Sequence, residues 1–397
     1  MTCEHTPSAK MPAAANISEL IGDDDRAWAE AQLPKLTAKF AAERDRVGSR
    51  IPYIAQDGLY REFEDETFIR WWTNGFWPGI LWQMRNATGD EAYTAPARGV
   101  EAKLDRVFDD NDTDHDAGFM WLLSAVADWR ATGNQQSRTR GLHAANLLIS
   151  RFNPVGRFLR AWNEQGREGW AIIDSMMNIP LLFWAAHETG DPRYVQVATM
   201  HADTLLEHVI RPDGSCNHIV CFDPLTGEFE DNPGGQGYES GSSWTRGQAW
   251  AIYGFALAAR NSGEVRYLDA AKRVAHYFCA NVALSGDLTP IDFRQPAEPE
   301  YRDALAAVIA ACGLMEVAEQ VPELERALYV RWAVRILKAV EANWCDWDPA
   351  HDGLVQCCSG SYHSEPDREV PMVYGDYYYV EAVLRLAGKA MRLWDGE

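Results

Sequence analysis

Four apolar stretches of the chain each end in a similar polar phrase that contains a glycine. The phrases are RNATGDEAY, WRATGNQQS, HETGDPRY and RNSGEVRY, with their glycines at Gly89, Gly133, Gly190 and Gly263. Glycine is the usual residue just past the last turn of a helix. The segment after each glycine places apolar residues at the helical spacing of about 3.6. The pattern therefore predicts a repeated unit of an apolar helix, a glycine turn and an amphipathic helix.

Two further helix pairs extend this pattern to the ends of the chain. Residues 301–320 pair with 324–343, and residues 375–394 pair with the segment 24–47, which makes about twelve helices in six pairs. The apolar helix of each pair needs burial on all sides, and the amphipathic helix covers it. Such pairs stack into an open solenoid or close into a ring. Unequal spacings and long polar inserts favour an all-α, closed α/α barrel with its loops at one end.

The domain organisation follows from this pattern and from composition. We expect a single barrel domain over residues 21–397 and a disordered or extended segment over 1–20, with QPAEPE at 295–300 as a loop. A hydrophobic content of 47% over 397 residues suffices for one large core. The net charge of -21 argues against nucleic acid as a partner, because such binding depends on lysine and arginine contacts to phosphate.

The cysteines and the N-terminal stretch indicate the compartment. The start MTCEHTPSAKMPAAANISEL has no basic region followed by an apolar one, so we expect no secretory signal. No run of about 18 apolar residues suggests a membrane span. The eight cysteines are then expected to be reduced thiols in a cytoplasmic protein, a monomer or weak dimer. Cys216, His218 and Cys221 fit no standard zinc spacing, so we expect no metal and no cofactor.

Chemistry-bearing residues gather where the apolar helices begin. Inner helices of a closed barrel run parallel, so their N-termini lie at one end, which we call the mouth. We therefore expect carboxylates, aromatic rings, histidines and one arginine to meet there. The residues concerned are Asp116, Asp174, Trp244–Arg246, Asp303, Asp376, the WWTNGFWPG segment at 71–79, and, from the long inserts, His218, Gln236, Tyr238, Tyr362 and His363.

Some of these groups have a purely structural interpretation. An aspartate at a helix start usually caps the helix by accepting a hydrogen bond from a free backbone N–H. We interpret Asp303 and Asp376 in this way, although either could line the mouth. Arg246 lies within an apolar helix start, so it needs an anionic partner. That partner is either an internal aspartate or a bound carboxylate.

Asp116 and Asp174 are stronger candidates for catalysis. Asp112 and Asp114 precede Asp116 and are better placed to cap, whereas Asp116 is followed at once by AGFMWLL. Asp174 follows Ala171–Ile173 and opens another apolar run, so apolar groups flank it on both sides. Removal from water raises the pKa of a carboxyl group, which keeps a proton donor loaded near neutral pH.

Five segments in order, from about residue 50 onward, resemble the unsaturated glucuronyl hydrolases of glycoside hydrolase family 88. They are WTNGFWPG, DHDAGF, IIDSMMNIPLLFWA, GGQGYESGSSWTRGQAWAIYGFA and PMVYGDYYYVEA. The resemblance implies an (α/α)6 barrel with its active site at the mouth. It also implies a substrate that carries a 4,5-unsaturated uronic acid at its non-reducing end, such as a fragment left by a polysaccharide lyase.

The resemblance also implies roles for individual residues. Asp174 matches the general acid and base, and Asp116 matches a second essential carboxyl group close to the reacting ring. The residues that match substrate-binding positions are His218, Gln236, Arg246, Trp250, the aromatic Trp72, Phe76 and Trp162, and also His115, Tyr362 and His363.

The expected chemistry is hydration of a vinyl ether. A proton added at C4 generates oxocarbenium character at C5, water adds there, and the hemiketal opens and releases the second sugar. The nearest alternative is an unsaturated rhamnogalacturonyl hydrolase that acts on pectin fragments. Two others are a conventional α/α-barrel glycosidase for saturated sugars and a carbohydrate-binding protein without catalysis. Arg246, Gln248, Trp250 and the IIDSMMN segment favour the glucuronyl enzyme.

The loop at 357–369 bears on substrate choice. No lysine occurs between Lys338 and Lys389, and Arg368 is the single arginine of this loop. Few basic groups favour unsulfated or lightly sulfated substrates, such as those from hyaluronan or chondroitin.

Overall fold

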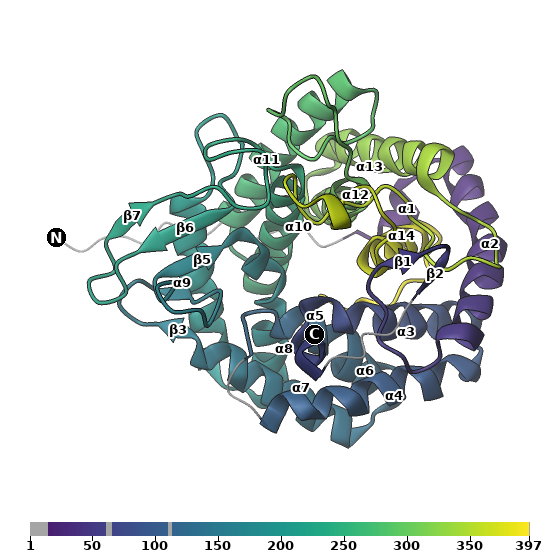
Figure 1. Ribbon diagram of the computed structural model, residues 1–397, viewed down its shortest axis with the longest axis horizontal. Helices are drawn as coiled ribbons and strands as arrows, with labels where there is room; N and C mark the ends of the chain where they lie inside the picture. The colour runs from purple at the N-terminus through teal and green to yellow at the C-terminus, as the bar shows by residue number, and fades with distance from the viewer. Residues whose placement is uncertain (1–14, 61–65, 110–112, 397) are drawn as a thin grey trace.

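Six pairs of helices form a ring in the computed structural model, which describes residues 15–60, 66–109 and 113–396 (Figure 1). The inner helices begin at one end and surround the barrel axis, and the outer helices cover them. The inner helices are α3 (Phe76–Thr88), α5 (Ala117–Trp121) continued by α6 (Ala127–Thr132), α8 (Pro180–Thr189), α10 (Thr245–Ser262), α12 (Ala304–Gln320) and α14 (Val373–Leu386). Their outer partners are α4 (Thr94–Leu104), α7 (Gln135–Ser150), α9 (Pro192–His208), α11 (Val265–Val282), α13 (Glu323–Trp344) and α2 (Asp23–Val47).

The helix pairs match the hydrophobic pattern. Every residue of α12 is buried, whereas its outer partner α13 mixes buried and exposed positions and covers it from outside. The predicted glycine turns are confirmed, because Gly89, Gly133, Gly190 and Gly263 each follow an inner helix with φ between 70° and 75°. A left-handed residue at this position lets the chain reverse into the outer helix. The predicted (α/α)6 barrel is therefore confirmed.

Two predictions about the chain ends are wrong. Residues 17–20, expected to be extended or disordered, form the short helix α1, because Ile17 is buried and its N–H donates to Glu319 at 3.0 Å. Residues 1–14 of that segment, like Asp112, lie outside the described residues. The expected helix 375–394 ends at Leu386, and Gly388 with φ of 67° directs the following segment beneath the barrel.

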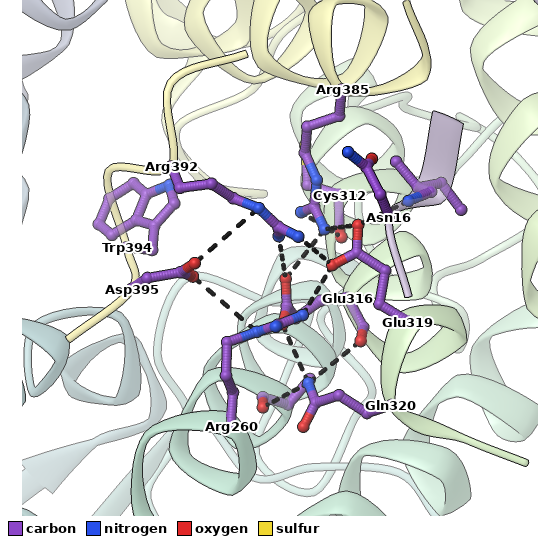
Figure 2. A network of polar contacts seen from close by, with 12 residues as sticks. Asn16, Arg260, Cys312, Glu316, Glu319, Gln320, Arg385, Arg392, Trp394 and Asp395 are labelled. Carbon is purple, nitrogen blue, oxygen red and sulfur yellow. Dashed lines mark hydrogen bonds and ion pairs between the residues drawn. The ribbon is translucent and has the colours of Figure 1, made fainter. Parts of the chain in front are cut away.

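The end of the barrel opposite the mouth, which we call the base, is closed by a network of buried charges (Figure 2). Arg260 of α10 and Arg385 of α14 contact Glu316 and Glu319, both near the last turn of α12. Arg392 from the C-terminal segment contacts the same two carboxylates. The network joins three inner helices to the C-terminal segment and gives each buried carboxylate several arginine partners.

Short strands at the mouth shape the loops. The antiparallel sheet β5 (Trp170–Ile172), β6 (Ile219–Phe222) and β7 (Phe229–Asp231) pairs Ile172 with Ile219. Two hairpins, β1 (Ala55–Gln56) with β2 (Leu59–Tyr60) and β3 (Phe152–Asn153) with β4 (Phe158–Leu159), complete the strands of the described residues. Within the same residues, every helix is too short or too polar to cross a bilayer.

Candidate active site

Asp174 lies on a 3-10 helix, η6 (Ile173–Met177), between strand β5 and helix α8. The residue at the cap position of η6 is Ile172, and Asp174 makes no capping hydrogen bond. Its Oδ1 has no hydrogen-bond partner among the described residues, and its side chain keeps 15% of its surface exposed. Asp174 is therefore a nearly buried carboxyl group that still reaches solvent, which a structural cap does not require.

Asp116 occupies the cap position of α5 but does not cap it, because Asn178 takes that role. The Oδ1 of Asn178 accepts the N–H of Phe119 at 2.9 Å. The Nδ2 of Asn178 faces Oδ1 of Asp116 at 3.3 Å and the carbonyl oxygen of Asp174 at 3.4 Å. One amide therefore joins the two aspartates across the mouth. Sequence reasoning missed Asn178, although its place four residues after Asp174, about one helical turn, could have indicated it.

Burial raises the pKa of both carboxyl groups. The pKa of Asp116 is raised to about 8, chiefly by burial and then by the nearby charge of Asp114. The pKa of Asp174 is raised to about 7 by burial and by Asp116, against the lowering effects of His115 and Arg246. Near neutral pH, protonated carboxyl groups therefore stand at the mouth. Such a group can donate a proton and then accept one.

His218 presents a fixed tautomer to Asp174. Its Nδ1 accepts the backbone N–H of Gln236 at 3.2 Å, so the ring proton of the neutral imidazole is on Nε2. Nε2 lies 3.6 Å from Oδ1 of Asp174. Burial lowers the pKa of His218 to about 3, and therefore the ring is a neutral donor. It can stabilise the Asp174 carboxylate after proton transfer.

His115 stands in a similar relation to Asp116, with the opposite tautomer. Its Nδ1 donates to the carbonyl oxygen of Ala161 at 2.9 Å, which leaves a lone pair on Nε2 in the neutral ring. Nε2 lies 3.3 Å from Oδ1 of Asp116. Two lone pairs this close repel each other unless one of the two groups is protonated. Burial lowers the pKa of His115 and raises that of Asp116, so the proton resides on Asp116.

Arg246 has an internal partner. Its Nη1 lies 3.4 Å from Oδ2 of Asp303 and donates to the carbonyl of Ser359, and Nη2 donates to Gly360 at 2.5 Å. Its guanidinium stacks 4.6 Å from the ring of Trp244. Of the two partners considered from sequence, the structure contains the internal aspartate. Arg246 joins α10 to the 357–369 loop, and its charge still lowers the pKa of Asp174.

The predicted residues of the two long inserts tie the loops of the mouth together. The Nε2 of Gln236 donates to Gly360 at 2.7 Å, and its carbonyl accepts the N–H of Tyr362 at 2.8 Å. The Nε2 of His363 lies 2.7 Å from the carbonyl of Tyr238. Tyr362 is buried between Tyr238 and Tyr301, whereas His363 is exposed. In the structure, the predicted residues of each insert therefore contact mainly the loop of the other insert.

Four of the predicted aromatic residues divide into two groups. Trp72 and Trp162 are half-buried, and the ring of Trp162 lies 6.4 Å from that of His115. Phe76 and Trp250 are completely buried. Trp250 lies one turn below Arg246 on α10 and packs against Phe119 and Tyr378, so side chains above it separate it from solvent. The structure does not place Phe76 and Trp250 on an exposed sugar-binding surface.

The two aspartates interpreted as caps differ. Asp303 caps α12, because its Oδ1 accepts the N–H of Leu305 at 3.0 Å. Asp376 is not a cap, because α14 already begins at Val373. Its Oδ1 accepts the N–H groups of Leu354 and Val355, and its Oδ2 accepts the hydroxyl of Tyr60. It anchors the loops beside the mouth instead. Within the described residues, no cluster of His, Cys, Asp and Glu is arranged to hold a metal ion.

Comparison with known proteins agrees with the fold and identifies the family. Residues 45–281 match the model of Glycosyl Hydrolase Family 88. The unsaturated glucuronyl hydrolase of Bacillus sp. (strain GL1) is 38% identical over 364 residues, which cover 88% of this chain and 94% of that protein. The unsaturated chondroitin disaccharide hydrolase of Streptococcus pyogenes serotype M1 is 36% identical over 323 residues, 79% of this chain and 80% of that protein.

The solved structures extend this similarity to three dimensions. The crystal structure of the Bacillus sp. GL1 unsaturated glucuronyl hydrolase, which degrades glycosaminoglycan, superposes with a TM-score of 0.84 at 36% sequence identity. The match covers 94% of this chain and 99% of that structure. The resemblance drawn from five short segments is confirmed, as is the prediction that the protein is a glycosidase. The chain belongs to glycosyl hydrolase family 88.

Proposed function

We propose that this glycosidase hydrates the C4=C5 double bond of a 4,5-unsaturated glucuronic acid at the non-reducing end of an oligosaccharide, with Asp174 as the proton donor. The observation that carries the proposal is the pair of nearly buried carboxyl groups, Asp116 and Asp174, joined by one amide and both still 15% exposed. The names of the relatives, unsaturated glucuronyl hydrolase and unsaturated chondroitin disaccharide hydrolase, support the substrate class.

The residues of the site account for the two proton transfers of the proposed reaction. Protonated Asp174 gives its proton to C4, the π electrons form the new C–H bond, and positive charge develops at C5 and the ring oxygen. Water attacks C5 and returns a proton to the Asp174 carboxylate. The hemiketal then opens at its ring C5–O bond, and C1 releases the second sugar. The Nε2–H of His218, 3.6 Å from Asp174, stabilises the carboxylate between the two transfers.

Asp116 and the half-buried rings have supporting roles in this proposal. Asp116 hydrogen-bonds the ring of the uronic acid, and Trp72 and Trp162 offer faces on which sugars can stack. The internal contacts of Arg246 and Gln236 indicate that these residues shape the pocket through the 357–369 loop.

Loss of the ultraviolet absorbance of an unsaturated disaccharide measures the proposed reaction directly. The purified protein should bleach this absorbance and should leave a saturated glucuronide uncleaved, because hydration requires the double bond. In heavy water the first turnovers should place deuterium at C4. Deuterium can also enter C4 of the released product later, by exchange with heavy water. Product incubated in heavy water with an Asp174→Asn variant measures this exchange. Cleavage of the saturated sugar, or product without deuterium at C4, would contradict the mechanism.

We further propose an unsulfated or lightly sulfated substrate, such as a hyaluronan or chondroitin disaccharide. Arg368, the single arginine of the 357–369 loop, is already engaged. Its guanidinium lies 3.7 Å from the ring of Tyr301 and donates to the carbonyl of Tyr362 at 2.9 Å. A panel of unsaturated disaccharides that differ in linkage and sulfation should therefore show the highest kcat/KM for unsulfated members.

We place the reaction in the cytoplasm as part of the same proposal. The seven cysteines of the described residues are all free thiols, which a reducing compartment maintains. Cell fractionation with an antibody to the native protein would test this location.

A further inference from the structure

A buried chain of three hydrogen bonds runs beside the 3-10 turn that carries Asp174. The backbone N–H of Leu159 on β4 donates to Nδ1 of His201 at 3.0 Å. Nε2 of His201 lies 2.7 Å from Oγ of Ser175, and Oγ of Ser175 lies 2.5 Å from the carbonyl oxygen of Ile172. Leu159, His201 and Ser175 are completely buried. His201 comes from the outer helix α9, so the chain joins the outer ring to the site.

Both ends of this chain determine the direction of every hydrogen bond in it. At one end a backbone N–H can only donate, so Nδ1 of His201 must carry the lone pair. At the other end a carbonyl can only accept, so the hydroxyl of Ser175 donates to Ile172. His201 must then donate from Nε2 to Ser175, which requires the neutral ring. Burial lowers the pKa of His201 to about 3, in agreement with this protonation state.

The chain holds one side of the Asp174 turn, and a second anchor holds the other. Ser175 follows Asp174 directly and is fixed by His201. Ile173 precedes it, and its N–H donates to the carbonyl of His218 at 3.1 Å. Asp174 therefore lies between two anchored neighbours. The side chain of Asp174 itself interacts with other groups, namely His115, Asp116, His218 and Arg246.

We propose that His201 and Ser175 are positioning residues, which hold the carboxyl group of Asp174 in register with His218 and Asp116 through the hydrogen bond between Nε2 of His201 and Oγ of Ser175. The proposal rests on the proposed function, since it assigns a task in proton transfer. Neither residue touches the substrate. A displacement of about 1 Å at a reacting group can cost about 100-fold in rate, so an anchor one residue away has a measurable effect.

Two substitutions of His201 separate the two halves of the chain. In His201→Gln the amide can still donate from about the position of Nε2 to Ser175, but the acceptor for Leu159 is lost. In His201→Asn the acceptor near Nδ1 is kept, but the contact with Ser175 is lost. Ser175→Ala breaks the same contact from the other side with a small change in volume. His208→Asn is the matched control, because His208 lies on the same helix and stacks on Phe229, away from this chain.

The expected result is a loss in kcat without a loss in binding. Ser175→Ala and His201→Asn should lower kcat about 10- to 100-fold with KM within about twofold, whereas His201→Gln and His208→Asn should retain most of kcat. Protonated Asp174 is the reactive form, so kcat falls as the pH rises through its pKa. A loosened Asp174 gains water, which shifts this limb of the profile to lower pH.

A readout independent of turnover distinguishes this proposal from the proposed function. The C=O stretch of the protonated Asp174 carboxyl, assigned by infrared difference against Asp174→Asn, reports its titration in the absence of substrate. Its midpoint should fall in Ser175→Ala and in His201→Asn but not in His208→Asn. Unchanged midpoints, or equal kcat in all four variants, would overturn the positioning role. Wild-type protein that fails to bleach any unsaturated disaccharide would overturn the function, and the infrared midpoints would still decide the positioning role.

Discussion

The two ends of the barrel both bury carboxyl groups, yet they treat them in opposite ways. At the base, burial raises the pKa of Glu316, but its three arginine partners lower that pKa by more than burial raises it (Figure 2). These partners are Arg260, Arg385 and Arg392, and the resulting pKa of Glu316 is about 2. At the mouth, Asp116 has no arginine ion pair in the described residues, and burial raises its pKa to about 8. Asp303, with the single contact to Arg246, lies between these two cases with a pKa of about 6.

The difference separates stability from reactivity along the same helices. The charge of Glu316 is fixed by three partners, so it joins helices and cannot exchange a proton near neutral pH. Asp116 and Asp174 keep oxygens without ion-pair partners, so their protons remain available. Since the desolvation of an unpaired carboxylate is costly, the mouth gives up stability that the base retains. The fold thus tolerates carboxyl groups without ion-pair partners at the mouth, because the buried carboxylates at the base have such partners.

The largest effect is expected at the mouth. Asp174→Asn keeps the shape of the carboxyl group but removes the transferable proton, so kcat should fall by about 10²- to 10⁴-fold. The melting temperature should stay within a few degrees, because the turn is held by Ser175 and Ile173. Initial rates of bleaching and a thermal melt measure the two effects. Near-normal turnover would remove Asp174 from the role of proton donor.

The base should show the reverse pattern. Arg385→Met removes a buried partner of Glu316 and Glu319 and should lower the free energy of unfolding by about 3–5 kcal/mol. The kcat of the folded variant should stay near the wild-type value. Urea denaturation measures the loss, and Arg193→Met, at an exposed ion pair with Asp191, serves as the control without effect. An unchanged free energy of unfolding in the Arg385→Met variant would show that the network is dispensable.

The two ends should also respond to pH with opposite signs. The pKa of Asp116 rises from 3.8 to about 8 on folding, so above pH 3.8 the unfolded chain releases its proton first and stability falls as the pH rises. Asp116→Asn removes this effect, and its melting temperature relative to wild type should increase from pH 4 to pH 8. The pKa of Glu316 falls from 4.5 to about 2, so its contribution is lost on acidification instead. A melting-temperature difference that stays flat from pH 4 to pH 8 would contradict the assignment for Asp116.

The smallest effect concerns the amide between the two aspartates. Asn178→Ala should cost about 1 kcal/mol of stability, because the N–H of Phe119 loses its capping partner. The hydrogen bond from Asn178 also lowers the pKa of Asp116, so its loss should raise that pKa further. Chemical denaturation and the infrared titration of Asp116 check both effects. An unchanged Asp116 titration would mean that Asn178 acts on the helix alone.

Local signals along the chain predicted most of the architecture. Each glycine turn marks the end of a helix and a reversal of the chain direction. The helix pairs could therefore be located from Gly89, Gly133, Gly190 and Gly263 without knowing how the pairs pack against one another. The end of α14 was missed, because Gly388 and the segment after it are directed by packing against the base. Within the site, Asp174 stood out because a charge within an apolar run is unusual. Ser175 and His201 carried no such signal.

The amino-acid sequence by itself determined the helix pairs, the common mouth and the two carboxyl groups placed against apolar neighbours, because helical periodicity and capping act over a few residues. Only the tertiary structure decided which charges are paired. Arg246 meets Asp303 across 57 positions, Asn178 meets Asp116 across 62, and Ser175 meets His201 from the outer ring. Ring closure sets such contacts, and since a pKa depends on the groups within a few ångströms, it also set which carboxyl groups can exchange a proton.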